Sequence, residues 1–197
     1  MSVRALFLAI ILAIAPLGAG AEVTSPDRFF KQPVGSDYYL ANYAEYEAYL
    51  KRIASESERI KLVDIGKTAE GRTMWMAVVS SPANLARLEE YRRIAETLAR
   101  GRVGEDEANK LAATGKAIVW IDAGMHATET VTSQGQIQVL YKLVSQSDAE
   151  TLRSLDDCIL LFGHDNPDGM DLVSNWYMRN ADPKKREFAT LPRLYQK

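Results

Sequence analysis

Two apolar runs decide the fold of this chain: Ala117-Ile118-Val119-Trp120-Ile121 and, further along, Cys158-Ile159-Leu160-Leu161-Phe162. Runs of this length without alternating polar residues are typical of strands buried on both faces of a sheet. Between them, residues 134–145 repeat apolar side chains at helical spacing: Ile137, Leu140, Tyr141 and Val144. A strand, a helix and a strand in this order predict a right-handed crossover between two parallel strands.

An antiparallel pair of strands is expected before this unit. Residues 61–65 alternate apolar and polar side chains, and residues 73–80 form a longer apolar run. The segment 66–72 between them contains two glycines, which suits a hairpin connection. Together, the antiparallel and parallel pairs predict an α/β fold on a mixed β-sheet.

Three further segments have the periodicity of helices. Residues 39–54 place five apolar side chains on one face: Tyr43, Tyr46, Tyr49, Leu50 and Ile53. Tyrosines in such a pattern are expected in the core rather than at a binding site. Helices are also expected over 83–100 and 104–114, whereas residues 22–36 are expected to be an irregular lead-in.

Residues 1–21 have the pattern of a secretion signal. Arg4 precedes an apolar run over 5–17, and Ala19-Gly20-Ala21 is the small-residue pattern that signal peptidase cleaves. A membrane anchor is the alternative interpretation, although the run is short for a transmembrane span. We therefore expect a secreted or periplasmic protein with no stable membrane insertion after cleavage.

The composition limits the remaining chain, residues 22–197, to one domain of ordinary type. The formal net charge of the whole chain is −2, and without a basic stripe we expect no nucleic-acid partner. The single cysteine, Cys158, excludes an intrachain disulfide, so an exported chain must be stabilised by packing or by a metal. Its position in an apolar run predicts a buried thiol.

His126 and Glu129 follow the first apolar run, at the start of the next helix. The carboxyl ends of strands in α/β sheets are where ligands bind. Imidazole nitrogen and carboxylate oxygen are ordinary zinc ligands, and Gly124 gives the backbone the freedom for a turn that lets them converge. The same spacing is also compatible with a glutamate that merely interacts with the helix dipole.

Four segments occur here in the order in which they occur in the carboxypeptidase A-like zinc peptidases. They are the hairpin 66–72, the metal segment 121–129, Asn166-Pro167-Asp168-Gly169, and Asn175-Trp176-Tyr177-Met178-Arg179. Residues 38–179 therefore resemble the N-terminal portion of that family's catalytic domain. The resemblance implies a three-layer sandwich with helices on both faces of the sheet.

The resemblance also implies a function: zinc-dependent hydrolysis of C-terminal peptide bonds, with the C-terminus of a peptide or protein as substrate. His126 and Glu129 would be the first two Zn²⁺ ligands. Arg179 would polarise the scissile carbonyl and stabilise the oxyanion, because a guanidinium keeps its charge and donates several hydrogen bonds. Asp168 and Gly169 are expected to form a turn.

The family's third zinc ligand and its general base cannot be matched to this sequence. We therefore expect residues 22–197 to be the N-terminal part of a catalytic domain that is inactive by itself. His164 follows the second apolar run and is a geometrically possible third ligand, although the family does not use this position. A histidine in a turn is the alternative.

Two other functions remain open. A zinc amidohydrolase or deacylase of the same fold would use the same first two ligands. A secreted binding module would keep the fold without the chemistry. Arg179 and the export signal favour the peptidase.

Overall fold

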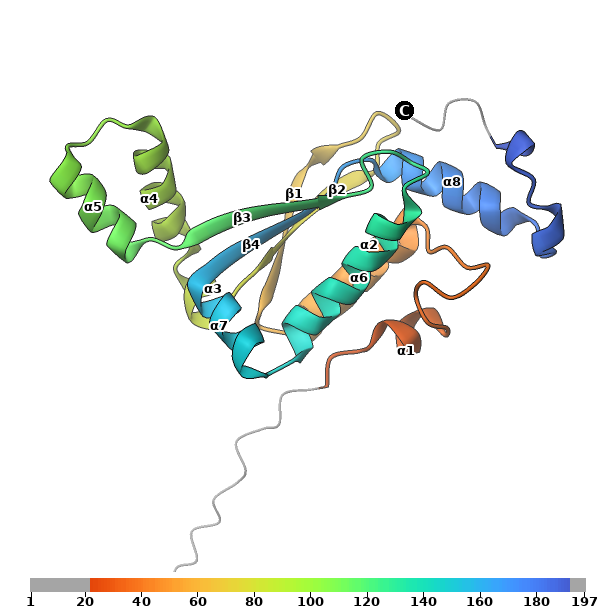
Figure 1. Ribbon diagram of the computed structural model, residues 1–197, viewed down its shortest axis with the longest axis horizontal. Helices are drawn as coiled ribbons and strands as arrows, with labels where there is room; N and C mark the ends of the chain where they lie inside the picture. The colour runs from red at the N-terminus through yellow and green to blue at the C-terminus, as the bar shows by residue number, and fades with distance from the viewer. Residues whose placement is uncertain (1–21, 192–197) are drawn as a thin grey trace, which may run out of the picture.

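The computed structural model describes residues 22–191, which form an α/β domain on a four-stranded mixed sheet (Figure 1). The strands are β1 (Ile60–Lys67), β2 (Thr73–Val79), β3 (Ala117–Ala123) and β4 (Cys158–His164), in spatial order β1-β2-β4-β3. The pairs β1–β2 and β2–β4 are antiparallel, and β3–β4 is parallel. The predicted hairpin, parallel pair and mixed sheet are confirmed.

Eight α-helices surround the sheet in the described residues. They are α1 (Pro26–Phe30), α2 (Tyr43–Glu56), α3 (Pro82–Ala86), α4 (Leu88–Arg100), α5 (Glu105–Thr114), α6 (Thr130–Ser145), α7 (Ala149–Asp157) and α8 (Pro167–Arg179). Two 3₁₀ helices follow, Pro183–Lys185 and Phe188–Thr190. The sequence patterns did not predict α1, α7 and α8.

The single helix expected over 83–100 is two helices, because Arg87 leaves the helical region with φ −110° and ψ 17°. The Asn84 side chain explains the separation: its amide donates to the Leu155 and Asp156 carbonyl oxygens at 3.0 and 2.9 Å. α3 is thereby attached to the end of α7, while α4 continues in another direction.

Each face of the sheet has its own core. On one face, α2 and α6 bury the five side chains predicted to share a helical face, from Tyr43 to Ile53. On the other face, α3 and α4 pack Leu85 and Tyr91 against the sheet. The neighbours Val78 and Val79 belong to opposite cores, as the alternation of side chains along a strand requires.

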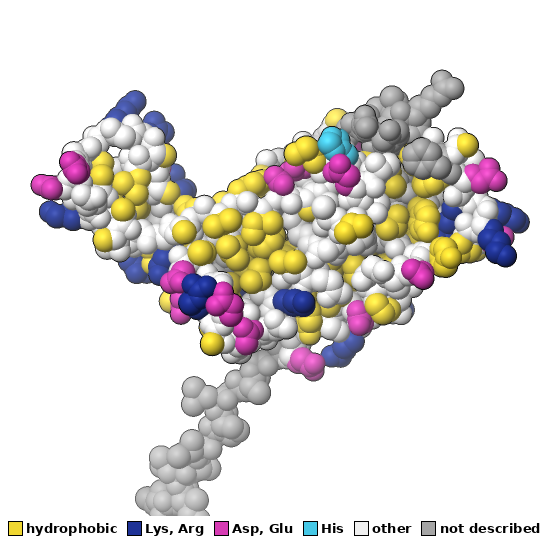
Figure 2. All heavy atoms as spheres, in the orientation of Figure 1, with side chains coloured by type: hydrophobic (Ala, Val, Ile, Leu, Met, Phe, Trp, Pro, Cys, Tyr) yellow, Lys and Arg dark blue, Asp and Glu magenta, His cyan; other side chains and the backbone are white. Residues whose placement is uncertain are grey.

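The prediction that β3 is buried on both faces is wrong. Ile118, Val119 and Trp120 are 41, 39 and 49 % exposed. Among the described strands β3 pairs only with β4 and ends the sheet, so an apolar strip faces outward along this side of the molecule (Figure 2). The thiol of Cys158 is half-buried rather than buried, because this residue is the first of β4 and lies where the strand leaves α7.

Within residues 22–191, no helix combines the length and the apolar character that crossing a bilayer requires. The expected secretion signal, residues 1–21, lies outside the described residues. The same is true of residues 192–197 of the expected domain 22–197.

Candidate metal site

The candidate metal site is a short connection between β3 and α6, residues 124–129, called the metal loop below. His126 Nδ1 lies 2.8 Å from Glu129 Oε1, and the Glu129 amide donates to the His126 carbonyl oxygen at 3.0 Å. Both side chains are about half exposed, at 52 and 54 %. A histidine is visible at the surface beside acidic side chains in Figure 2. The structure thus brings together the two residues predicted to bind zinc.

Local hydrogen bonds explain the shape of the metal loop. Gly124 has φ +71°, and its amide donates to Thr132 Oγ1 at 3.2 Å. The same hydroxyl donates to the Glu129 carbonyl oxygen at 3.0 Å, so one threonine in the first turn of α6 ties both ends of the loop. Glu129 precedes α6, and its side chain contacts His126 and makes no capping hydrogen bond to the helix.

The chemistry of this pair suits a divalent cation. The 2.8 Å contact is a hydrogen bond in the tautomer that carries its proton on His126 Nδ1, because a carboxylate only accepts hydrogen bonds. Zinc would replace that proton, since it binds imidazole nitrogen and carboxylate oxygen. Within residues 22–191, however, no group of three or more His, Cys, Asp or Glu side chains could hold a metal. A zinc ion here would therefore need a further ligand from outside the described residues.

His164 does not join this pair. It is the last residue of β4, not part of a turn, and its side chain is only 3 % exposed. Its Nε2 lies 3.0 Å from Ser133 Oγ. Burial lowers the pKa of the His164 imidazole from 6.5 to about 4, so the ring is neutral at pH 7. The hypothesis that His164 is the third ligand is not supported by this position.

The segment Asn166-Pro167-Asp168-Gly169 was predicted to be a turn, and that prediction is wrong. Asn166 caps α8 by accepting a hydrogen bond from the Gly169 amide at 2.8 Å, and Pro167 is the first helical residue. The Asn166 side chain also donates to the Met125 carbonyl oxygen at 3.4 Å. The start of α8 therefore touches the metal loop.

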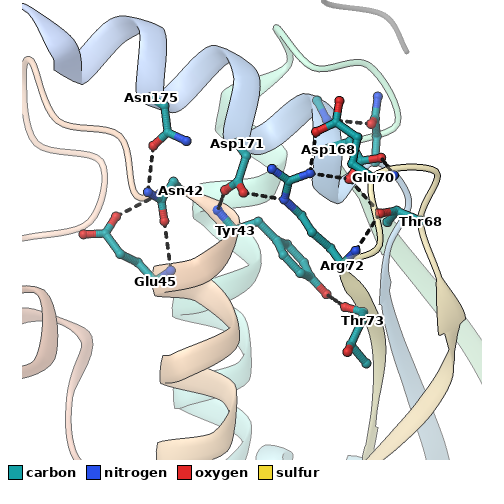
Figure 3. A network of polar contacts seen from close by, with 12 residues as sticks. Asn42, Tyr43, Glu45, Thr68, Glu70, Arg72, Thr73, Asp168, Asp171 and Asn175 are labelled. Carbon is teal, nitrogen blue, oxygen red and sulfur yellow. Dashed lines mark hydrogen bonds and ion pairs between the residues drawn. The ribbon is translucent and has the colours of Figure 1, made fainter.

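A second polar cluster, not predicted from the sequence, joins the β1–β2 hairpin to α8 (Figure 3). We call Arg72, Asp168 and Asp171 the arginine clamp. Arg72 Nη1 lies 2.7 Å from Asp168 Oδ1, and Arg72 Nε lies 2.5 Å from Asp171 Oδ2. Asp168 also accepts from Thr68 Oγ1 at 2.7 Å, and Asp171 accepts from the Tyr43 amide at 2.7 Å.

Asp168 of the clamp is ionised despite its burial. Burial by itself would raise the pKa of Asp168, but the hydrogen bonds from Thr68, Arg72 and the Glu70 amide outweigh it and hold that pKa below its usual value. In the sequence the only signals were the hairpin arginine and the spacing of Asp168 and Asp171, which places both on one face of a helix.

Arg179 lies at the other end of α8, about 18 Å along the helix axis from the start that touches the metal loop. It is exposed and lines a cavity of about 320 Å³ together with the clamp residues. Within residues 22–191 no hydrogen bond or ion pair engages its guanidinium, and neither His126 nor Glu129 lines this cavity. Its predicted catalytic role stays a prediction.

A larger, mainly apolar cavity of about 620 Å³ adjoins the metal loop. Thr128 and Thr130, the neighbours of Glu129 on either side, both line it. The remaining walls come from the segment before α2, from α6 and from the aromatic residues Trp176 and Tyr177 of α8. A volume of this size is typical of sites that bind small molecules or side chains.

Comparisons with known proteins concern the family and the fold of this chain. A family model described as zinc carboxypeptidase matches residues 46–191. Among solved structures, thrombin activatable fibrinolysis inhibitor is similar with a TM-score of 0.50 and 14 % identity over 72 % of this chain. A carboxypeptidase A from Helicoverpa armigera is similar with a TM-score of 0.48 and 22 % identity, also over 72 % of this chain.

The chain spans only 30 % and 27 % of the lengths of these two structures. No curated protein sequence matches the chain.

Proposed function

This chain belongs to the zinc carboxypeptidase family, and on that premise we propose that it supplies part of the catalytic centre of a zinc-dependent carboxypeptidase. Its substrate would be the C-terminal peptide bond of a peptide or protein. The observation that carries the proposal is the contact between His126 Nδ1 and Glu129 Oε1, half exposed at the carboxyl end of β3.

In this proposal His126 and Glu129 are two of the zinc ligands. When bound, zinc supplies a Lewis acid for the scissile carbonyl and for the attacking water. Zinc binds imidazole and carboxylate ligands only in their deprotonated forms, so metal affinity falls as the pH is lowered. The third ligand and the general base would come from polypeptide outside the described residues.

We propose that Arg179 stabilises the negative charge that develops on the carbonyl oxygen of the substrate. Its support is the guanidinium that lies unpaired among the described residues and lines the 320 Å³ cavity. The apolar 620 Å³ cavity beside the metal loop supports a substrate with a bulky side chain near the scissile bond. Export through residues 1–21 would place the activity in the periplasm or outside the cell.

Zinc binding to the purified chain tests the metal site directly. The probe is Zn²⁺ alone at pH 7.5, and the variants are His126→Ala and Glu129→Gln. Glu107→Gln is the matched control, because Glu107 is an exposed carboxylate in the first turn of α5. We expect one weak site in the wild type and the control, and loss of that site in both loop variants. Equal zinc uptake by wild type and His126→Ala would refute the site.

Substrate choice separates the peptidase from the other two functions. The protein isolated from its source is assayed on blocked C-terminal dipeptides and on N-acyl amino acids. Cleavage of the dipeptides supports the carboxypeptidase, whereas cleavage of the acyl amino acids alone would indicate a deacylase. Absence of any turnover would favour the binding module.

Arg179→Lys and Arg179→Gln test the third proposed residue in the same assay. A guanidinium that contacts the developing oxyanion predicts a lower kcat in both variants, because this contact strengthens only in the transition state. A rise in KM with an unchanged kcat would place Arg179 in substrate binding alone.

A further inference from the structure

The metal loop rests directly on the ring of His164. A Cβ atom built on Gly124 would lie 2.5 Å from both Cε1 and Nε2 of His164, and 2.5 Å from Ser133 Oγ. Gly124 follows Ala123 of β3, which is paired in register with His164 of β4. The backbone of the loop therefore leaves the sheet in contact with the imidazole, an approach that only glycine allows at this φ.

Packing alone does not explain a histidine at this position. Its ring lies among apolar groups, with its centroid 5.6 Å from the ring centroids of both Tyr43 and Tyr46. Ser133 contacts Nε2, but Nδ1 is buried and has no hydrogen-bond partner among the described residues. A buried ring nitrogen without a partner costs stability, and an apolar ring of similar size would avoid that cost.

The contacts of His164 reach both ends of the metal loop through the first turns of α6. Ser133 binds the His164 ring, and its neighbour Thr132 binds the Gly124 amide and the Glu129 carbonyl oxygen. The same hydroxyl of Ser133 and the same ring edge of His164 face the Gly124 backbone. The position of α6 relative to β4 is thus coupled to the separation of His126 and Glu129.

We propose that His164 and Ser133 form a positioning pair for the metal loop. The pair holds α6 and the loop backbone against the end of β4, so that His126 and Glu129 are already convergent before a metal binds. This inference rests on the proposed zinc site but concerns residues that would not touch the metal. Supporting groups of this kind orient ligands and raise metal affinity.

Two variants of His164 with similar polarity test the geometry. The amide of His164→Gln reaches about as far as imidazole Nε2 and can keep the contact with Ser133, whereas the amide of His164→Asn reaches only about as far as Nδ1. Affinity for Zn²⁺ alone is followed through the ring resonances of His126, which are easily assigned because the chain has only two histidines. We expect about tenfold weaker binding in His164→Asn and Ser133→Ala. His164→Gln should stay within about threefold of the wild type, since it restores the contact.

A second readout needs no metal. In the metal-free wild type, the nitrogen resonances of His126 should report a proton on Nδ1 that is held by Glu129. In His164→Asn and Ser133→Ala this signature should weaken, because the loop is no longer held in the convergent form. Leu155→Ala is the control for general destabilisation: Leu155 is only 1 % exposed and packs in the same core at the end of α7, away from the loop.

The outcomes separate the two proposals. If His126→Ala retains zinc, the proposed metal site itself fails. If His126→Ala loses zinc while His164→Asn and Ser133→Ala bind as tightly as the wild type, only the positioning pair is refuted. An equal loss of affinity in Leu155→Ala would also refute it, because general stability would then explain the effect. If His164→Asn does not fold, Ser133→Ala decides alone.

Discussion

The arginine clamp includes two residues of α8, and the metal loop contacts the start of the same helix. The two clusters differ in how deeply their polar side chains are buried and in how many hydrogen bonds these side chains make. In the clamp, each carboxylate accepts hydrogen bonds from Arg72 and from at least one other group, and both aspartates are about nine-tenths buried. In the metal loop, the His126 and Glu129 side chains contact each other and are half exposed. A cluster whose carboxylates are buried and multiply hydrogen-bonded is a structural joint between two elements, whereas a half-exposed pair can still accept a ligand.

The largest effect should come from breaking the clamp. Arg72→Met leaves Asp168 and Asp171 buried without a cation, which should lower the free energy of unfolding by about 3 kcal/mol or more. Urea unfolding at pH 7 measures this loss. Arg92→Met is the control, because Arg92 forms exposed ion pairs with Glu89 and Glu96 on α4 and should leave stability unchanged. Equal losses in the two variants would remove the distinction between a joint and a surface pair.

The next largest effect is the loss of stability at acidic pH. The pKa of His164 is about 4 in the folded chain and 6.5 in the reference state, so the unfolded chain binds more protons between these values. The stabilisation is complete above pH 6.5 and is lost as the pH falls towards 4. Between pH 7.5 and 4.5 the free energy of unfolding should fall by about 2–3 kcal/mol from this group.

His164→Phe should remove this part of the pH dependence, and His126→Ala should retain it. Asp168 of the clamp acts in a different pH window, because its lowered pKa makes its contribution to stability disappear only at more acidic pH. Identical slopes for wild type and His164→Phe between pH 7.5 and 4.5 would contradict the assignment.

A smaller effect is expected at the start of α2, which lies next to the clamp. Asn42 and Glu45 form a capping box with hydrogen bonds of 2.9 Å in both directions, and Asn42 also donates to Asn175 of α8 at 2.8 Å. Asn42→Ala should cost about 1 kcal/mol of stability in thermal or urea unfolding. Asn42→Asp keeps the cap but not the donor to Asn175, so it isolates the contact with α8.

The smallest change in stability should follow mutation of the metal loop. His126→Ala removes a half-exposed contact, so the free energy of unfolding in the absence of metal should stay within about 0.5 kcal/mol of the wild type. The same variant should nevertheless lose zinc binding. A large loss of stability would mean that the His126–Glu129 pair, like the arginine clamp, holds structural elements together.

Local patterns predicted the parts of the fold that depend on neighbouring residues. The tyrosine face of α2, the hairpin and the parallel strands all follow from periodicity and turn chemistry. The sequence Asn166-Pro167-Asp168-Gly169 was misread because asparagine followed by proline suits both a turn and the first residues of a helix. The exposure of β3 was missed because burial of a strand depends on which segments lie beside it.

The candidate site likewise has one part that neighbouring residues predict and other parts that depend on distant segments. His126 and Glu129 are three residues apart, so their convergence could be predicted from one short loop. The partners of the clamp are not local: Arg72 and Asp168 are separated by 96 positions, and no periodicity connects them. The place of His164 between two tyrosines of α2 and a serine of α6 likewise depends on how distant segments pack.

The position of β3 affects how this chain should behave at high concentration. The backbone amides on its outer side have no partner strand among residues 22–191, and the side chains around them are apolar. Such an edge is a template for another strand. Dilute samples should exchange these amide hydrogens with solvent quickly, and concentrated samples should exchange them slowly and scatter more light. Charged substitutions at Val119 or Trp120 should therefore raise the solubility of the chain.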